Sequence, residues 1–182
     1  ASQAAETGRS IMYMLEANPG PGLGVLLAYC FFCKDDTTRQ SAPGAVIIHL
    51  LGGIHEIYFP YILMNPIIIL APIVGNFCAI LFYSMTGAGL SGPASPGSII
   101  AYMAMAPRDS ILTVLLGVVI AAGVSFVLST IILKATSGHT KSLTDAQNEM
   151  NEMKAQAKGT IPEPTAVNVG QIRKIVFSCD AG

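Results

Sequence analysis

The distribution of apolar residues predicts one complete membrane-spanning helix. Residues 111–133 form a run without charge, long enough as an α-helix to cross a hydrocarbon core of roughly 30 Å. Lys134 and Lys141 follow it, so we expect this end on the cytoplasmic side. Small residues recur at every fourth position of the run: Gly117, Ala121, Ser125 and Ser129. Such a stripe is typical of the face on which membrane helices pack closely.

The other apolar segments are interrupted by glycine and proline. Broken or half-spanning helices occur at membrane depth only where they are buried in protein or line a cavity. The pattern therefore favours a transporter over a simple membrane anchor. The interrupted segments are residues 11–33, which we expect no regular helix to cross at residues 18–22; residues 46–51, which end at a Gly-Gly pair; residues 66–90, which are long enough to span although Pro72 and Gly75 would bend them; and residues 98–106, after a loop at 91–97.

The character of the chain changes after Leu133. Residues 136–158 are polar with a spacing that suits an exposed helix, and residues 159–170 contain Pro-Glu-Pro and are typical of a flexible tether. Residues 175–177, Ile-Val-Phe, predict a buried strand of a parallel sheet. We therefore expect an α-helical polytopic membrane protein with broken or re-entrant helices (1–134), a flexible cytoplasmic linker (135–170) and the first strand of a truncated α/β domain (171–182).

Composition supports this fold class. The chain has 182 residues, of which 52% are hydrophobic and 12% charged, whereas soluble domains carry about 25% charged residues. The net charge of −1 argues against nucleic acid as a partner. Cys30 and Cys33 form a Cys-x-x-Cys pair, but no second pair completes a zinc site, so we expect apolar helix residues and no metal. The chain starts at Ala1 without a signal peptide, and we expect it to be an internal part of a longer protein.

Glu56 is the only formally charged residue between Arg39 and Arg108. A lone carboxylate in an apolar stretch is costly unless it contacts a polar substrate, an ion or a partner group. It follows a Gly-Gly break and precedes aromatic residues and prolines, which indicates a membrane-embedded binding site. The alternative is a structural ion pair with a cation outside this sequence. His55 is a second candidate, unless it only packs beside the motif, and we expect His49 to be a satisfied helix histidine.

Cys179 stands directly after the predicted strand and is followed by Asp-Ala-Gly. The carboxyl ends of parallel strands are where α/β sheets place ligands and nucleophiles. Backbone N–H groups of a following loop and helix N-terminus would hold a phosphate there and depress the pKa of the thiol. An ordinary core cysteine is the alternative interpretation.

The sequence resembles the mannitol-specific enzyme II family of the bacterial phosphoenolpyruvate-dependent sugar phosphotransferase system, nearly from end to end. The resemblance is strongest where Gly-Ile-His-Glu and Cys-Asp-Ala-Gly occur in this order, joined by a tether. It implies that residues 1–134 are the C-terminal half of the membrane-embedded IIC domain, and that residues 171–182 begin the IIB domain. The stretches that carry it are residues 16–22, 50–66, 91–98 and 175–182.

The resemblance also implies a function. Mannitol uptake would be coupled to mannitol phosphorylation, with the phosphoryl group passing from a phosphorylated IIA protein or domain to Cys179 and then to the sugar alcohol, without another cofactor. Glu56 and His55 would belong to the sugar site. The protein would be a homodimer that crosses the bacterial cytoplasmic membrane several times, with the linker and IIB in the cytoplasm. This sequence lacks the family's phosphate loop and first half of IIC, so we expect it to be inactive by itself.

The chemistry of a sugar alcohol is consistent with these residues. A carboxylate accepts two hydroxyl hydrogen bonds, and both are charge-assisted. Asn18 or Asn65 would add amide contacts, and either Glu56 or His55 would act as the general base. A related hexitol or fructose is an alternative substrate. The competing hypothesis is a secondary transporter or channel in which Glu56 binds a proton or an ion and no covalent chemistry occurs.

Overall fold

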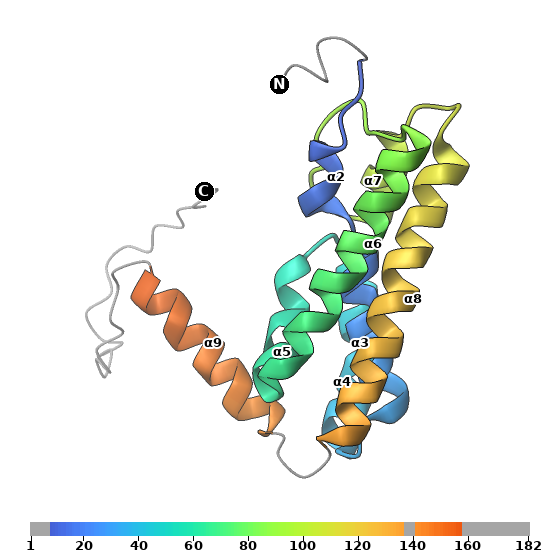
Figure 1. Cartoon of the computed structure of the whole chain (residues 1–182). Helices are drawn as coiled ribbons and strands as arrows, with labels where there is room; N and C mark the ends of the chain where they lie inside the picture. Colours follow the sequence, from blue (N-terminus) through green and yellow to red (C-terminus); the bar gives the residue numbers. More distant parts are fainter. Residues whose placement is uncertain (1–7, 137–140, 158–182) are drawn as a thin grey trace, which may run out of the picture.

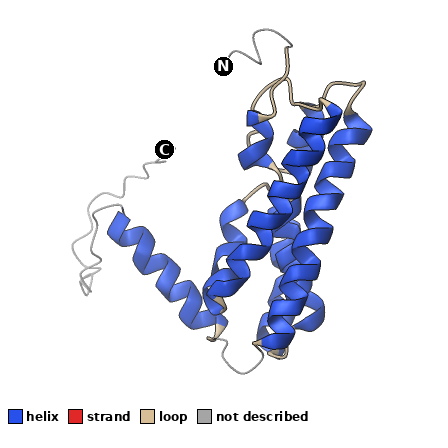
Figure 2. Cartoon of the chain, viewed as in Figure 1, coloured by secondary structure: helices blue, strands red, loops and turns tan. Residues whose placement is uncertain are grey.

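The computed structural model describes residues 8–136 and 141–157, and this part of the chain folds into helices joined by short loops (Figures 1 and 2). The predicted strand, the predicted tether and Cys179 lie outside the described residues. Two helical stretches, Pro66–Thr86 and Ile111–Ala135, are long and apolar enough to cross a membrane. The elements are α2 (Met12–Ala17), α3 (Gly20–Phe32), α4 (Asp36–Leu50), η1 (His55–Tyr58), α5 (Phe59–Met64), η2 (Pro66–Ile69), α6 (Leu70–Thr86), α7 (Ile99–Ala104), α8 (Ile111–Ala135) and α9 (Leu143–Ala157).

Helix α8 packs against α3 and α6 through its small residues, and α6 and α8 run side by side (Figure 1). The four residues of the predicted stripe are all buried. A Cβ atom on Gly24 of α3 would lie 2.4 Å from the carbonyl oxygen of Ala122, so the two backbones approach as only glycine permits. Ser125 Oγ donates a hydrogen bond of 2.8 Å to the carbonyl oxygen of Pro21. The predicted close-packing face is therefore confirmed.

The first interruption is narrower than the sequence predicts. Helix α2 ends at Ala17 and α3 begins at Gly20, so only Asn18 and Pro19 are outside the helices. The prediction that no regular helix crosses residues 18–22 is confirmed, although residues 20–22 already belong to α3. Pro21 lies in the first turn of that helix, where a missing N–H costs no hydrogen bond. Asn18 Oδ1 accepts a hydrogen bond of 3.0 Å from the Gly20 N–H and satisfies one free donor at this helix start.

Helix α4 begins well before the predicted apolar piece at residues 46–51. Asp35 caps it by accepting hydrogen bonds from the backbone N–H of Thr38, at 2.8 Å, and from its hydroxyl, at 2.6 Å. These bonds to the side chain and backbone of Thr38 hold the pKa of the Asp35 carboxyl below its ordinary value. Pro43 lies within the helix. The predicted end is confirmed, since α4 stops at Leu50 and Gly53 takes a φ of +72°.

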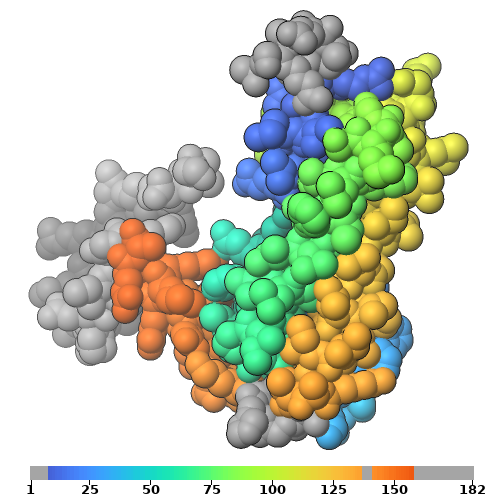
Figure 3. Space-filling model, in the orientation of Figure 1, coloured from blue at the N-terminus to red at the C-terminus, as the bar shows by residue number. Residues whose placement is uncertain are grey.

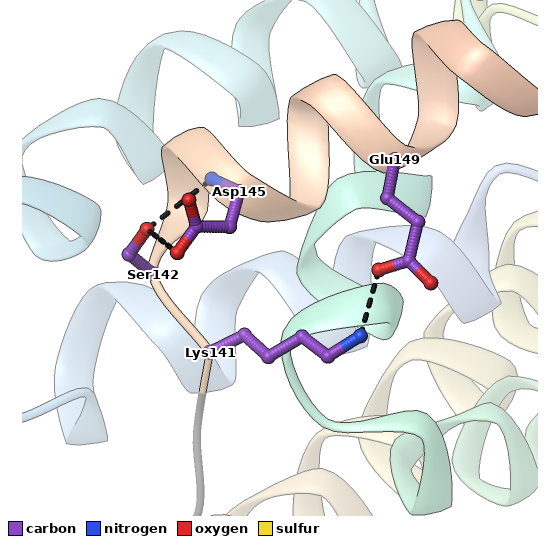
Figure 4. Close-up of polar contacts among 4 residues, drawn as sticks. All are labelled: Lys141, Ser142, Asp145 and Glu149. Carbon is purple, nitrogen blue, oxygen red and sulfur yellow. Dashed lines mark hydrogen bonds and ion pairs between the residues drawn. The ribbon is translucent and has the colours of Figure 1, made fainter.

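Helix α9 confirms the predicted polar helix and packs against α5, as the space-filling view also shows (Figure 3). The backbone N–H of Lys141 donates to the carbonyl oxygen of Met64 at 3.1 Å, which ties the start of this segment to the end of α5. Ser142 Oγ donates to Asp145 at 2.7 Å and accepts from its backbone N–H, and Lys141 pairs with Glu149 at 2.8 Å (Figure 4). This part of the expected linker is therefore a docked helix.

Candidate functional site

A cavity of about 510 Å³ opens where the break between α2 and α3 meets α4, η1 and α6. Most of its lining is apolar. This combination of size, apolar walls and a few converging polar groups is that of a small-molecule site. The polar side chains that line it are Glu16, Asn18, His49, His55 and Asn76.

His55 is held in this cavity by the loop before α7. Its Nε2 lies 2.8 Å from the carbonyl oxygen of Gly97. A carbonyl only accepts hydrogen bonds, so Nε2 carries the hydrogen, and Nδ1 is the acceptor nitrogen of the neutral ring. Gly53 fits against the same loop, because a Cβ atom there would lie 2.6 Å from the backbone nitrogen of Ser98. The fold thus brings the Gly-Ile-His-Glu motif into contact with the loop at residues 91–98, and the sequence analysis identified both.

His49 packs behind His55 as a fully buried side chain. Its Nε2 lies 2.9 Å from the carbonyl oxygen of Pro19, and its ring centroid is 4.8 Å from that of His55. The ring of Tyr58 contacts the His49 ring edge-on, with 5.5 Å between the two centroids. The expectation of a satisfied histidine is met only at Nε2, because the buried Nδ1 of His49 has no hydrogen-bond partner in the described part of the chain. His49 also forms part of the cavity wall, which its position in the sequence did not indicate.

Asn18 lines the cavity, its contact with a sugar stays a prediction, and a second amide accompanies it. Asn18 Nδ2 donates to Asn76 Oδ1 at 3.1 Å, and Asn76 Nδ2 donates to the carbonyl oxygen of Leu15 at 2.9 Å. The sequence analysis missed Asn76. The available signal was a carboxamide in the middle of the apolar residues 66–86, which is as unusual there as a charge.

Glu56 follows His55 in η1, but it does not line the 510 Å³ cavity. Its side chain is 69% exposed and forms an ion pair with Lys154 of α9. It lines a neighbouring cavity of about 610 Å³, which shares Glu16 and His55 with the first one. The carboxylate therefore has a cation partner within this chain, and His55 and Glu16 border both cavities.

Asn65 lies apart from the other candidates. Its Nδ2 donates to Thr136 Oγ1, which in turn donates to the carbonyl oxygen of Ile132 at 2.6 Å. These contacts tie the end of α5 to the end of α8. Asn65 lines neither of these two cavities, nor a third of about 410 Å³ that His55 also borders. The structure thus brings Asn18 and His55 together, with Glu56 beside His55, and leaves Asn65 outside; its role in sugar binding stays a prediction.

The described cysteines are not part of this site. Cys30, Cys33 and Cys78 are all free thiols that lie in or at the ends of helices, as the sequence analysis expected of the Cys-x-x-Cys pair. Across residues 8–136 and 141–157, no three His, Cys, Asp or Glu side chains converge as metal ligands would.

Comparison with known proteins confirms the resemblance seen in the sequence. The chain is 49% identical over 190 residues to the "PTS system mannitol-specific EIICB component" of Bacillus subtilis (strain 168), covering 99% of this chain and 40% of that protein. It is 49% identical to the component of the same name from Geobacillus stearothermophilus, covering 99% of this chain and 39% of that protein. It is 48% identical to the "PTS system mannitol-specific EIICBA component" of Escherichia coli (strain K12), covering 99% of this chain and 29% of that protein.

The similarity covers nearly the whole of this chain but less than half of each of these relatives. No protein-family model matches the sequence, and no solved structure matches it significantly. The chain is a relative of mannitol-specific EIICB and EIICBA components, and it corresponds to part of their length.

Proposed function

We propose that this chain is a segment of a mannitol-specific enzyme II of the IICB type, a phosphotransferase that takes up mannitol and phosphorylates it. The observation that carries the proposal is the convergence of Asn18, Asn76 and His55 in one cavity of about 510 Å³ with mainly apolar walls. A sugar alcohol presents only hydroxyl groups as polar contacts, and carboxamides and imidazoles both donate and accept hydrogen bonds. The names of the relatives indicate which polyol to test first.

We assign the general base to His55. Its Nε2 is engaged by the carbonyl of Gly97, which leaves Nδ1 to accept a proton from a sugar hydroxyl. Glu56 lines the neighbouring cavity, which shares His55 and Glu16 with the first. It is proposed to accept hydrogen bonds from hydroxyls of the sugar that extend into that cavity, and its charge would strengthen them. Lys154 is then the counter-ion of Glu56 in the absence of sugar.

Cys179 is proposed to carry the phosphoryl group, received from a phosphorylated IIA protein or domain. In the transfer step, the hydroxyl oxygen attacks phosphorus, the S–P bond breaks, and an O–P bond forms. The hydroxyl proton passes to His55 Nδ1, and the cysteine leaves as a thiolate. Such a transfer depends mostly on positioning and charge stabilisation. No cofactor is required beyond the phosphoryl group that the cascade supplies.

The two apolar helices support a location in the bacterial cytoplasmic membrane. We propose a multi-pass homodimer, with Cys179 on the cytoplasmic side where its donor is found. The tether, residues 159–170, would let Cys179 reach both the sugar and the donor.

The test uses the longer protein that contains this chain, in membrane vesicles with phosphoenolpyruvate and its phosphotransfer partners. We expect labelled mannitol to be bound and converted to mannitol phosphate, in preference to other hexitols and fructose. Uptake of mannitol that leaves it unphosphorylated would instead support a secondary transporter. Binding and phosphorylation of another sugar alone would correct the substrate.

A further inference from the structure

Asn76 is the only carboxamide within residues 66–86, a stretch apolar enough to span a membrane. A polar amide in such a helix costs free energy unless hydrogen bonds satisfy it. Asn76 is partly buried and reaches across from α6 to the break between α2 and α3. Asn76 therefore links α6, which is apolar enough to span a membrane, to the non-helical residues between α2 and α3 in the cavity wall.

The two hydrogen bonds of Asn76 fix the orientation of its carboxamide. Its Nδ2 donates to the carbonyl oxygen of Leu15, 2.9 Å away, in the last turn of α2 where carbonyls have no helical partner. Its Oδ1 accepts from Asn18 Nδ2 at 3.1 Å. Because the Leu15 carbonyl can only accept, the nitrogen of Asn76 must face it, and the oxygen must face Asn18.

The same chain of bonds fixes Asn18. With the oxygen of Asn76 on one side and the N–H of Gly20 on the other, at 3.0 Å from Asn18 Oδ1, only one orientation of the Asn18 amide satisfies both neighbours. These contacts use one N–H and one acceptor position of Asn18. A carboxamide has two of each, so one donor and one acceptor are left for a ligand in the cavity that Asn18 lines. A sugar hydroxyl both donates and accepts hydrogen bonds, so it can use the free acceptor and the free donor of Asn18 together.

We propose that Asn76 is a positioning residue of the polyol site, which sets the orientation of the Asn18 carboxamide toward the sugar hydroxyls. This inference rests on the proposed function. Without the Asn76 oxygen, Asn18 Nδ2 loses its partner and only the Gly20 N–H still holds the Asn18 carboxamide, so the donor and acceptor of Asn18 are held less firmly toward the sugar. Loss of the Asn76 oxygen should weaken sugar binding only. The dissociation constant and KM for mannitol should therefore rise, while the rate at saturating mannitol should stay the same.

The experiment is a double-mutant cycle on the full-length protein, with labelled mannitol as the probe. Asn18→Ala and Asn76→Ala should each weaken binding by about fivefold, the fold-change for a lost neutral hydrogen bond. The double variant should be no weaker than either single variant, because Asn76 acts through Asn18. Ser84→Ala is the matched control, since Ser84 is exposed on the same helix and should leave binding unchanged.

Two further readouts keep the proposal falsifiable if Asn76→Ala folds poorly. Asn76→Gln keeps a carboxamide, with an oxygen to accept from Asn18 and an N–H to donate to the Leu15 carbonyl, so it should bind mannitol more tightly than Asn76→Ala and nearer to wild type. In the phosphorylation assay, the variants should raise KM and keep kcat. The inference is overturned by additive effects of Asn18→Ala and Asn76→Ala, by equal weakening in Asn76→Gln and Asn76→Ala, or by wild-type binding in Asn76→Ala. If the wild-type protein itself binds no mannitol, the proposed function fails instead.

Discussion

His55 and Gly97 are joined by a contact that depends on the absence of a side chain. The imidazole Nε2 lies 2.8 Å from the carbonyl oxygen of Gly97, and a Cβ atom on Gly97 would lie 2.7 Å from the same nitrogen. The loop therefore approaches the ring as closely as glycine allows. This contact sets the hydrogen-bonded nitrogen of His55 and the place of its ring in the lining of both cavities.

Gly97→Ala is predicted to displace the His55 ring and weaken mannitol binding by about fivefold or more, the equivalent of one lost hydrogen bond. The matched control is Gly92→Ala in the same loop, where the new methyl group would meet only Met105 Sδ at an ordinary 3.6 Å. Equilibrium binding of labelled mannitol to both variants is the measurement. Equal binding by Gly97→Ala and wild type would show that the place of His55 does not matter for the sugar.

Glu56→Ala is predicted to weaken mannitol binding by at least about tenfold, because a charge-assisted hydrogen bond contributes roughly 1.5–3 kcal/mol. Lys154→Ala separates this role from a purely structural one. The pair is solvent-exposed on both sides, and such ion pairs contribute at most about 1 kcal/mol, so binding should stay within about fivefold of wild type. If the two variants lose equal affinity, Glu56 serves the ion pair and not the sugar.

The sequence predicted the elements that a continuous apolar run marks and missed a helix start that a capping residue marks. The span at residues 111–133 was recognisable because every residue in it is uncharged, and α8 differs from it only by two residues at its C-terminal end. The start of α4 at Asp36 was missed. The first turns of α4 contain Thr, Arg, Gln and Ser, so they form no apolar run. The helix start is marked instead by the Asp35 cap, which a search for hydrophobic runs does not detect.

The sequence likewise indicated only some residues of the candidate site. His55 and Asn18 were found because each stands in a conspicuous local motif. Asn76 and His49 were missed because their importance comes from elements that meet only in the fold. Lys154, the partner of Glu56, is 98 residues away in the chain, and the sequence offers no sign of that pairing.

The contact between α6 and α8 gives a prediction about stability. A Cβ atom on Gly117 would lie 2.1 Å from the ring of Tyr83, whose hydroxyl donates to the carbonyl oxygen of Val114 at 3.0 Å. Gly117→Ala should therefore destabilise the membrane part by about 1–3 kcal/mol through overpacking. Gly123→Ala is the control on the same helix, because its methyl group meets nothing within 4 Å.

The measurement is thermal unfolding of both glycine variants in detergent. Gly123→Ala should equal or slightly exceed wild-type stability, since alanine favours a helix by about 1 kcal/mol over glycine. A melting temperature of Gly117→Ala at or above that of Gly123→Ala would contradict the packing of Tyr83 on α8.

Phosphorylation of mannitol by a Cys179→Ser variant of the full-length protein tests the central claim most directly. With phosphoenolpyruvate and the phosphotransfer partners present, the wild type should form labelled mannitol phosphate, and the variant should form none while it binds mannitol with nearly wild-type affinity. This separation follows from a cysteine that carries the phosphoryl group and a sugar site built by His55, Asn18 and Glu56. Mannitol phosphate formed by the Ser variant at the wild-type rate would contradict the account.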